Sequence, residues 1–355
     1  MRVIVDVMGG DNAPLELLKG VILAWKELDV SFVLVGNRRM LEEIATEHEL
    51  DLSPFDIVHT DEVITMEDAP LSVMRAKKDS SMAMGLRLLA NGDGDVFVSA
   101  GNTGALFTGA TLIVRKVRGI QRAAIGSVLP APAPCLLLDT GANVTVNEEC
   151  LEQFAVMGSA YVKKVFHLDE PSVALLNNGT EACKGTPLHV AAHQRLSACP
   201  SIHFVGNVEG NAVPFGVCNV VVTDGFTGNV FVKTMEGMGK LMLGLVKQMF
   251  TKSGISKLSA LMVKRSLVDI KKSYDPAEYG GSPFLGISKP EVKAHGSSDA
   301  KSFKSAIRNA VSYARSGVIF DIAEEAEHFA AMKRAEQAAK ENDGEETCDA
   351  AQKLG

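Results

Sequence analysis

The chain has 355 residues, of which 46% are hydrophobic and 22% charged, and its formal net charge is −7. These values are typical of a soluble globular protein, and the negative charge argues against a general nucleic-acid-binding role. No apolar stretch is long enough to span a membrane, and the short apolar run over residues 3–7 is no signal peptide. Six scattered cysteines without a C-x-x-C pair fit a reducing cytosol, so we expect a cytoplasmic protein.

Short apolar strands alternate with helical patterns along most of the chain. The first helix is expected to begin near Pro14, because proline suits the first helical turn and apolar residues then recur at helical spacing. This alternation predicts right-handed βαβ units and a mostly parallel sheet between two helical layers, a three-layer α/β/α fold. The predicted strands cover residues 2–8, 30–35, 57–59, 95–99, 135–138, 173–176, 202–205 and 220–223.

Most predicted strands end in a turn that pairs glycine with Asn, Asp or Thr. Ligands of parallel sheets bind beyond the carboxyl ends of the strands, and backbone N–H groups in such turns suit an anion. Any single turn is equally well explained by the conformational freedom of glycine, but their recurrence predicts an anion or carbonyl site at one sheet edge. No complete G-x-G-x-x-G or G-x-x-x-x-G-K-[ST] motif occurs, so dinucleotide and Walker-type sites lack their fingerprints.

The stretch over residues 220–230 shows this pattern most clearly. A buried strand ends at Asp224-Gly225, and a helical pattern begins near Gly228-Asn229. Lys184 lies in a similar turn over residues 179–185, although a solvated surface lysine is the ordinary alternative.

Histidines offer two further candidates. His189 and His193 have the spacing of a helical metal pair, but the Glu of H-E-x-x-H and a third ligand are absent, so we expect no metal site. His295 precedes a Gly-Ser-Ser turn that resembles the anion turns. Helix capping by Ser298 or Asp299 explains that turn nearly as well.

Residues 237–272 form a basic amphipathic segment. The segment contains eight Lys and Arg residues and one acid, Asp269, so it carries +7 while the rest of the chain carries −14. Its apolar residues follow helical spacing on both sides of Ser253-Gly254, which predicts a helical hairpin. Core packing and a solvated face are the ordinary alternatives, but the local reversal of charge suits an acidic protein partner or an anionic membrane surface.

Five motifs together resemble a known family. They cover residues 5–14, 99–105, 138–143, 178–185 and 223–230, and they occur in the order found in the phosphate acyltransferases of bacterial phospholipid synthesis. The resemblance runs from residue 1 to about 325, which we expect to be one catalytic domain containing the hairpin. Residues 326–355 are expected to form a helical to disordered acidic tail.

The resemblance implies an isopropylmalate-dehydrogenase/phosphotransacetylase-like fold, with the hairpin protruding, in a homodimer. It implies transfer of a fatty acyl group from acyl carrier protein to inorganic phosphate, giving acyl phosphate for a membrane-bound glycerol-3-phosphate acyltransferase. Lys184 and Asn229 correspond to residues proposed as catalytic in the family, and no cofactor is implied. The hairpin would contact the carrier protein and an anionic membrane, which would make the enzyme peripherally membrane-associated. Its expected contact residues are Lys240, Lys247, Lys252, Lys257, Lys264 and Arg265.

Elementary chemistry is consistent with this reaction. Phosphate is substantially dianionic near neutral pH and a thiol leaves readily, so the site needs to place phosphate and stabilise an oxyanion rather than supply a strong base. An NAD-dependent decarboxylating dehydrogenase of the same fold and a non-catalytic membrane adaptor remain the alternatives. Loop position alone predicts further site-lining residues, namely Asp6, Gly10, Asn12, Asn102, Thr103, Asp224, Gly228 and His295.

Overall fold

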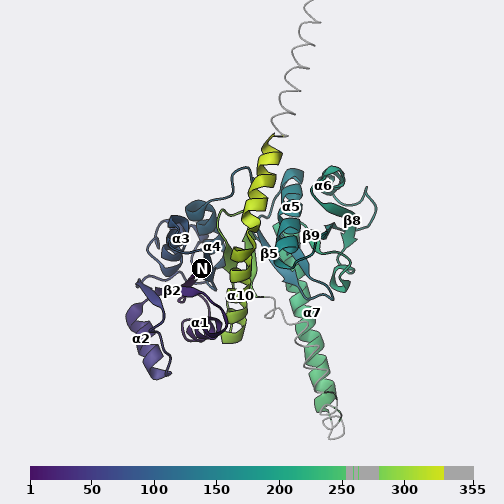
Figure 1. The fold of residues 1–355 in the computed structure, drawn as a ribbon. Helices are drawn as coiled ribbons and strands as arrows, with labels where there is room; N and C mark the ends of the chain where they lie inside the picture. Colours follow the sequence, from purple (N-terminus) through teal and green to yellow (C-terminus); the bar gives the residue numbers. More distant parts are fainter. Residues whose placement is uncertain (253–258, 260–262, 264–279, 332–355) are drawn as a thin grey trace, which may run out of the picture.

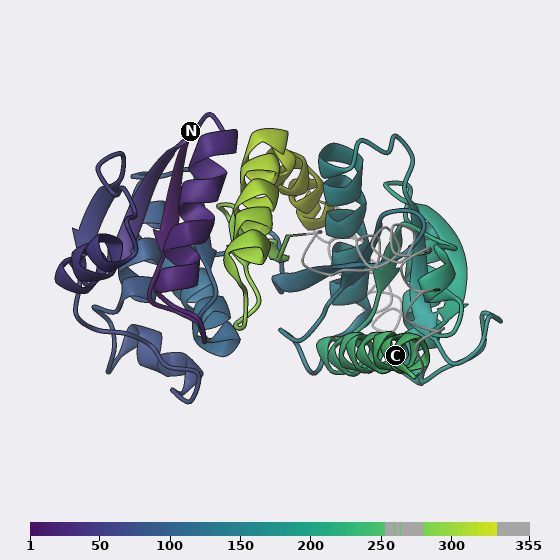
Figure 2. The same ribbon diagram turned by 90° about the horizontal axis from the view of Figure 1, so that it is seen from below.

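The computed structural model describes residues 1–252, 259, 263 and 280–331. Within them, one eleven-stranded sheet has the order β3-β2-β1-β4-β11-β10-β5-β6-β9-β7-β8. The ribbon forms two lobes with helix α10 between them (Figures 1 and 2). The strands are β1 (Arg2–Asp6), β2 (Ser31–Gly36), β3 (Asp56–His59), β4 (Val96–Ser99), β5 (Ala124–Leu129), β6 (Cys135–Leu138), β7 (Ser172–Asn177), β8 (His203–Glu209), β9 (Val220–Val222), β10 (Ser282–Leu285) and β11 (Glu291–Lys293).

Helices connect most of these strands. The longer helices are α1 (Leu15–Glu27), α2 (Arg38–Glu47), α3 (Ser81–Asn91), α4 (Thr103–Gly109), α5 (Glu148–Val165), α6 (Pro187–Ala198), α7 (Gly225–Thr251) and α10 (Ala300–Ser316). The short helical turns η1 (Pro70–Met74) and η3 (Val213–Phe215) lie in loops, and the π-helical turn η2 (Ala110–Val114) directly continues α4.

The sheet consists of two parallel blocks that run in opposite directions. Strands β3, β2, β1, β4 and β11 are parallel to one another, and so are β6, β9, β7 and β8. Between the blocks, β10 is antiparallel to both β11 and β5, and β5 is antiparallel to β6. The expectation of one shared edge was therefore wrong, because the carboxyl ends of the strands form two groups, one in each block.

Helices cover both faces of the sheet. One face packs on α1, α5, α6 and α10, and strand residues that alternate along the chain, such as Val3 and Val5, point into this layer. The intervening residue Ile4 points to the other face, where α3 and α4 cover the first block and the start of α7 covers the second. The predicted three-layer fold with a mostly parallel sheet is thus confirmed.

The strands missing from the prediction are β5, β10 and β11. Two of them have only three or four residues, and the middle residue of β11 is flanked by the charged Glu291 and Lys293, so no apolar run marks it. These strands join the two blocks.

Helix α7 extends well beyond the body of the protein (Figure 1). Its first three turns pack on the second block through Phe231, Val232 and Met235. Further along, added Cβ atoms at Gly237, Gly239 and Gly244 would meet nothing within 4 Å. The first arm of the predicted hairpin is therefore a free-standing helix, while residues 253–258, 260–262 and 264–272 of the second arm lie outside the described residues.

After α10, a further helix over residues 318–331 runs through the predicted domain boundary at residue 325. Val318, Ile322 and Ala326 on this helix are buried in the main core. The rest of the predicted tail, 332–355, lies outside the described residues.

Candidate functional site

The loops after β6 and β9 pack directly against each other in the second block. The buried Asp139 carboxylate organises them, because it accepts hydrogen bonds from the backbone N–H groups of Ile125, Gly141, Ala142 and Asn143 at 2.7–3.2 Å. The side-chain amide of Asn143 adds another at 2.9 Å. These loop N–H groups thus bind an internal carboxylate rather than remaining available for a ligand.

Asn229 stands at the rim of this pair of loops. Its Nδ2 donates to the carbonyl oxygen of Thr140 at 3.1 Å, which fixes the amide against the β6 loop. An amide nitrogen carries two N–H donors, so the second can serve a ligand. Gly228 allows this approach, since an added Cβ would lie 1.8 Å from the Asp139 carbonyl oxygen.

The N-terminus of α7 is largely satisfied internally. Asp224 caps it, accepting from the Thr227 N–H at 2.9 Å and from the Thr227 hydroxyl at 2.7 Å. The Gly225 N–H donates to Asn143 and the Gly228 N–H to Asp224. Asp224 therefore acts as a helix cap, and the expectation that this helix end presents its free N–H groups to an anion was wrong for three of its first four.

Lys184 lies in the loop after β7, in the same block as Asn229. Its side chain is about half exposed and lies 4.0 Å from Glu181. The Asn177 amide donates to the Lys184 carbonyl at 3.1 Å, and the Asn207 amide donates to that of Glu181 at 2.8 Å, so β7 and β8 both hold the loop. Strands β9 and β7 are parallel neighbours, so Lys184 and Asn229 share one end of the second block, although their hydrogen bonds go to different partners.

The loops after β1, β4 and β11 meet at the carboxyl end of the first block. Asp6 is buried and accepts from the Ser99 hydroxyl at 2.8 Å and from the Met8 N–H at 3.1 Å. Burial raises the pKa of Asp6 above its usual range. Gly10, at φ +115°, allows the close approach of its loop, since a Cβ there would lie 3.0 Å from the Gly296 carbonyl oxygen.

Two predicted lining residues in this group hold loops together. The Asn12 amide donates to the carbonyls of Ser297 and Ser298 at 3.1 and 3.2 Å, joining the β1 and β11 loops. The Asn102 side chain caps α4 through the Ala105 N–H and donates to the carbonyls of Thr65, Met66 and Asp68. Thr103 is exposed at the start of α4.

Lys293 is a functional candidate that the sequence analysis missed. It ends β11, is only 7% exposed, and donates from Nζ to the carbonyls of Ala100 at 3.2 Å and Ala294 at 2.5 Å. Burial lowers its pKa to about 8, against the opposing effect of Asp11 and Asp6. A lysine within so short a strand, directly before the His295 turn, was the signal that could have revealed it.

Helix α7 brings charge from the second block towards this first group of loops. Burial lowers the pKa of His295, and the positive charges of Lys233, Lys293 and Lys240 lower it further. Lys233 is itself paired with Glu236 at 2.9 Å. The predicted site residues therefore form two groups, and the charges of Lys233 and Lys240 on α7 act on His295 in the first group.

The free-standing part of α7 carries both charge and exposed apolar surface. Lys240, Lys247 and Lys252 are exposed, whereas Lys257, Lys264 and Arg265 lie outside the described residues. About half of each large apolar side chain on this arm is exposed, namely Met238, Leu241, Met242, Leu243, Leu245 and Met249.

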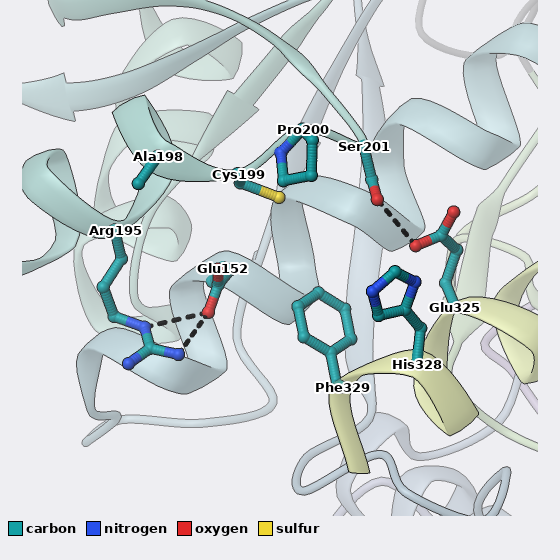
Figure 3. Close-up of a pocket in the computed structure, with 9 residues that line it drawn as sticks. All are labelled: Glu152, Arg195, Ala198, Cys199, Pro200, Ser201, Glu325, His328 and Phe329. Atoms are coloured by element: carbon teal, nitrogen blue, oxygen red, sulfur yellow. Dashed lines mark hydrogen bonds and ion pairs between the residues drawn. The ribbon is translucent and has the colours of Figure 1, made fainter. Parts of the chain in front are cut away.

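A separate pocket lies between α5, α6 and the helix over 318–331 (Figure 3). Its charged groups already pair with polar neighbours, since Arg195 donates twice to Glu152 at 2.6 and 2.8 Å, and the Ser201 hydroxyl donates to Glu325 at 2.8 Å. Cys199, His328 and Phe329 complete much of the lining. None of the predicted site residues lines this pocket.

Among the described residues, no group of three or more His, Cys, Asp or Glu side chains is placed to hold a metal ion. None of the helices in the described ranges is long and apolar enough to cross a bilayer.

Comparison with known proteins identifies the family. Residues 1–320 match the family described as "Fatty acid synthesis protein". A phosphate acyltransferase of Thermotoga maritima is 46% identical over 329 residues, covering 92% of this chain and 96% of that protein. The chain belongs to the phosphate acyltransferase family. It is accordingly an acyltransferase enzyme, with a place in fatty acid or phospholipid synthesis.

Another phosphate acyltransferase and two solved structures are also similar to this chain. The phosphate acyltransferase of Thermoanaerobacter pseudethanolicus is 42% identical, covering 92% of this chain and 98% of that protein. A phosphotransacetylase from Streptococcus pyogenes superposes with a TM-score of 0.60 at 16% identity, covering 89% of this chain and 94% of the other. The EutD phosphotransacetylase from Staphylococcus aureus gives a TM-score of 0.57 at 15% identity, with the same coverage. At these identities, the phosphotransacetylase structures establish a shared fold.

Proposed function

We propose that this phosphate acyltransferase moves a fatty acyl group from the thioester of acyl carrier protein to inorganic phosphate. A phosphate oxygen attacks the thioester carbonyl carbon, the carbon–sulfur bond breaks, and the products are acyl phosphate and the free carrier thiol. The observation that carries the proposal is the family match over residues 1–320. The acyl phosphate would then be used by a membrane-bound glycerol-3-phosphate acyltransferase.

The chemistry needs little acid–base help from the protein. Inorganic phosphate is substantially dianionic near pH 7, by analogy with the second ionisation of a phosphate ester near 6. A leaving thiol with a pKa of about 8.5 departs as thiolate without a strong acid. The main tasks left to the protein are to hold a phosphate oxygen against the face of the thioester carbonyl carbon and to stabilise the tetrahedral oxyanion.

Asn229 is suited to the oxyanion. Because its Nδ2 is anchored to the Thr140 carbonyl at 3.1 Å, the amide is held before the substrate arrives, and its second N–H can donate to the developing charge. Lys184, half exposed on the neighbouring loop, would offset negative charge on the reacting groups. The thioester would thus meet the second-block loops at the rim next to α7.

The free-standing arm of α7 would receive the acyl donor. Its lysines suit an acidic carrier protein or an anionic membrane, and its exposed methionines and leucines give an adaptable apolar contact. We place the enzyme in the cytoplasm, as a homodimer in peripheral contact with the membrane. No described feature favours the dehydrogenase alternative.

Release of carrier thiol tests the proposed reaction. Incubation of the enzyme with acyl carrier protein bearing a fatty acyl thioester is expected to release free thiol only when inorganic phosphate is present, with acyl phosphate formed in equal amount. Thiol release that is independent of phosphate would indicate a thioesterase and overturn the proposal. Binding of NAD⁺, measured by calorimetry in parallel, would favour the dehydrogenase instead.

Charge reversal on the α7 arm tests the docking of the donor. In the double variant Lys247→Glu and Lys252→Glu, the KM for acyl carrier protein is expected to rise about 10-fold at low salt, and the difference should shrink as salt screens the charges. Lys240 is left unchanged because its charge reaches His295. The matched control, Lys26→Glu with Lys163→Glu, changes the net charge equally at exposed positions on the body. Equal behaviour of the two double variants would contradict a docking role for the arm.

A further inference from the structure

Strand β11 carries two buried titratable groups, Lys293 and Glu291, whose carboxylate oxygens have no hydrogen-bond partner among the described residues. Lys293 is only 7% exposed, and among the described residues no carboxylate lies within ion-pair distance of its Nζ. Burying an ammonium is costly, and proteins ordinarily compensate by pairing it. Its two carbonyl acceptors, on Ala100 and Ala294, satisfy two of its three N–H donors. One donor is left for a ligand.

Three loops surround this ammonium, and their backbones pack closely against one another. An added Cβ at Gly9 would lie 2.8 Å from the Cα of Gly101, and the Asp11 N–H donates to the Gly296 carbonyl at 2.8 Å. The loops after β1, β4 and β11 therefore hold the lysine in one place. A cation fixed in this way loses little entropy when it binds an anion.

The charges that face Lys293 come from both blocks. His295 lies two residues further on the same loop, and the positive charge of Lys233, on α7, acts on both Lys293 and His295. The negative charges of Asp6 and Asp11 act on the ammonium in the opposite sense to Lys233, and Glu236 pairs with Lys233. Asp6 is buried and hydrogen-bonded within the first block, which leaves Lys233 and His295 as the groups suited to an incoming anion.

We propose that Lys293, with His295 on its loop and Lys233 on α7, binds the inorganic phosphate that accepts the acyl group. This assignment rests on the proposed function for the identity of the anion. Phosphate would lie between the two blocks, held by the first block through Lys293 and by the second through Lys233. Lys184 and Asn229 would then serve the thioester carbonyl.

Two phosphate groups that take part in the proposed reaction suit this ammonium. One is inorganic phosphate, and the other is the phosphodiester in the pantetheine arm of the carrier protein. The observations favour inorganic phosphate, because the ammonium is nearly enclosed and a small ion reaches it most easily. A donor without the phosphodiester, an acyl N-acetylcysteamine thioester, separates the two sources.

The test replaces the buried charge and follows phosphate binding through the KM for phosphate and through the rise in Tm that phosphate causes. In Lys293→Met, the KM for inorganic phosphate is expected to rise at least about 10-fold with either thioester donor, while the KM for each donor stays unchanged. Inorganic phosphate should raise the Tm of the wild-type enzyme and of the control Lys116→Met, but not that of Lys293→Met. Lys116 is a fair control since it is a partly buried lysine that likewise donates to a backbone carbonyl, that of Gln121, and its backbone pairs with Ile287, just after β10.

A second variant keeps the test valid if Lys293→Met does not fold. Lys233 is 56% exposed on the helix surface, so Lys233→Met should fold normally and raise the phosphate KM about 3- to 10-fold. A wild-type phosphate KM and Tm response in both variants would overturn the inference. So would a defect confined to the KM for acyl carrier protein.

The outcomes also separate this inference from the reaction itself. If the wild-type enzyme forms no acyl phosphate, yet phosphate raises its Tm in a Lys293-dependent manner, the proposed reaction fails and the phosphate site stands. If the enzyme is active and both variants bind phosphate normally, the reaction stands and the phosphate site is wrong.

Discussion

Turnover is expected to fall about 10²–10³-fold when Asn229 is replaced by alanine, because loss of one preorganised oxyanion donor raises the barrier by about 3–4 kcal/mol. Lys184→Ala should cause a comparable loss through unbalanced charge in the transition state. Both residues are exposed, Asn229 in the second turn of α7 and Lys184 in the loop after β7, so the fold should survive either change. Steady-state kinetics with acyl carrier protein and phosphate measures the effect as a change in kcat.

Two controls accompany these variants. Asn229→Asp keeps the shape of the side chain but removes both N–H donors, so it should be at least as impaired as Asn229→Ala. Lys163→Ala removes another exposed lysine and should leave kcat unchanged. Near-normal turnover of Asn229→Ala or Lys184→Ala, with an unchanged Tm, would refute the role assigned to that residue.

The second large effect is expected from Gly228→Ala. The added methyl group would lie 1.8 Å from the Asp139 carbonyl oxygen, and Asp139 cannot move easily because its carboxylate accepts from four backbone N–H groups. Relief of this clash must push the start of α7 away from the β6 loop. The free energy of unfolding should fall by about 3 kcal/mol, at the upper end for overpacking, and turnover should fall because Asn229 moves with the helix.

A glycine on the same helix provides the comparison for Gly228→Ala. Gly239 has nothing within 4 Å of an added Cβ, so Gly239→Ala should raise stability by about 0.5–1 kcal/mol through helix propensity. Denaturant unfolding of the two variants checks both values. If Gly228→Ala were as stable as Gly239→Ala, the close contact of the two loops would not exist in solution.

Three residues that were predicted to line the site have a structural role instead. Asp224, Asn102 and Asn12 were selected for loop position, and the structure uses all three to cap helices or to hold loops. Asn and Asp suit ligands and caps for the same reason, which is a short side chain with well-placed oxygen and nitrogen atoms. A sequence pattern therefore cannot distinguish the two uses, because the partner atoms lie far away along the chain.

What the sequence determined by itself was local. Apolar runs that end in glycine turns predicted β1, β4 and β9, because the apolar residues of each strand and the glycine of its turn stand next to one another in the sequence. The five ordered motifs predicted the family, which the relatives confirm. Helical spacing with an excess of lysine predicted the arm of α7, and its first half stands free of the body.

Only the tertiary structure decided how these parts meet. The reversal between the two blocks arises where β10 and β5 pair across about 160 residues of sequence, and no local pattern encodes such a partner. Together with the antiparallel pairs β10–β11 and β5–β6, that pairing divides the glycine turns into two groups. The ammonium of Lys293 is likewise buried by loops distant in sequence, one of which supplies the Ala100 carbonyl. Local chemistry thus named most of the candidate residues, and long-range strand pairing decided which of them face one another.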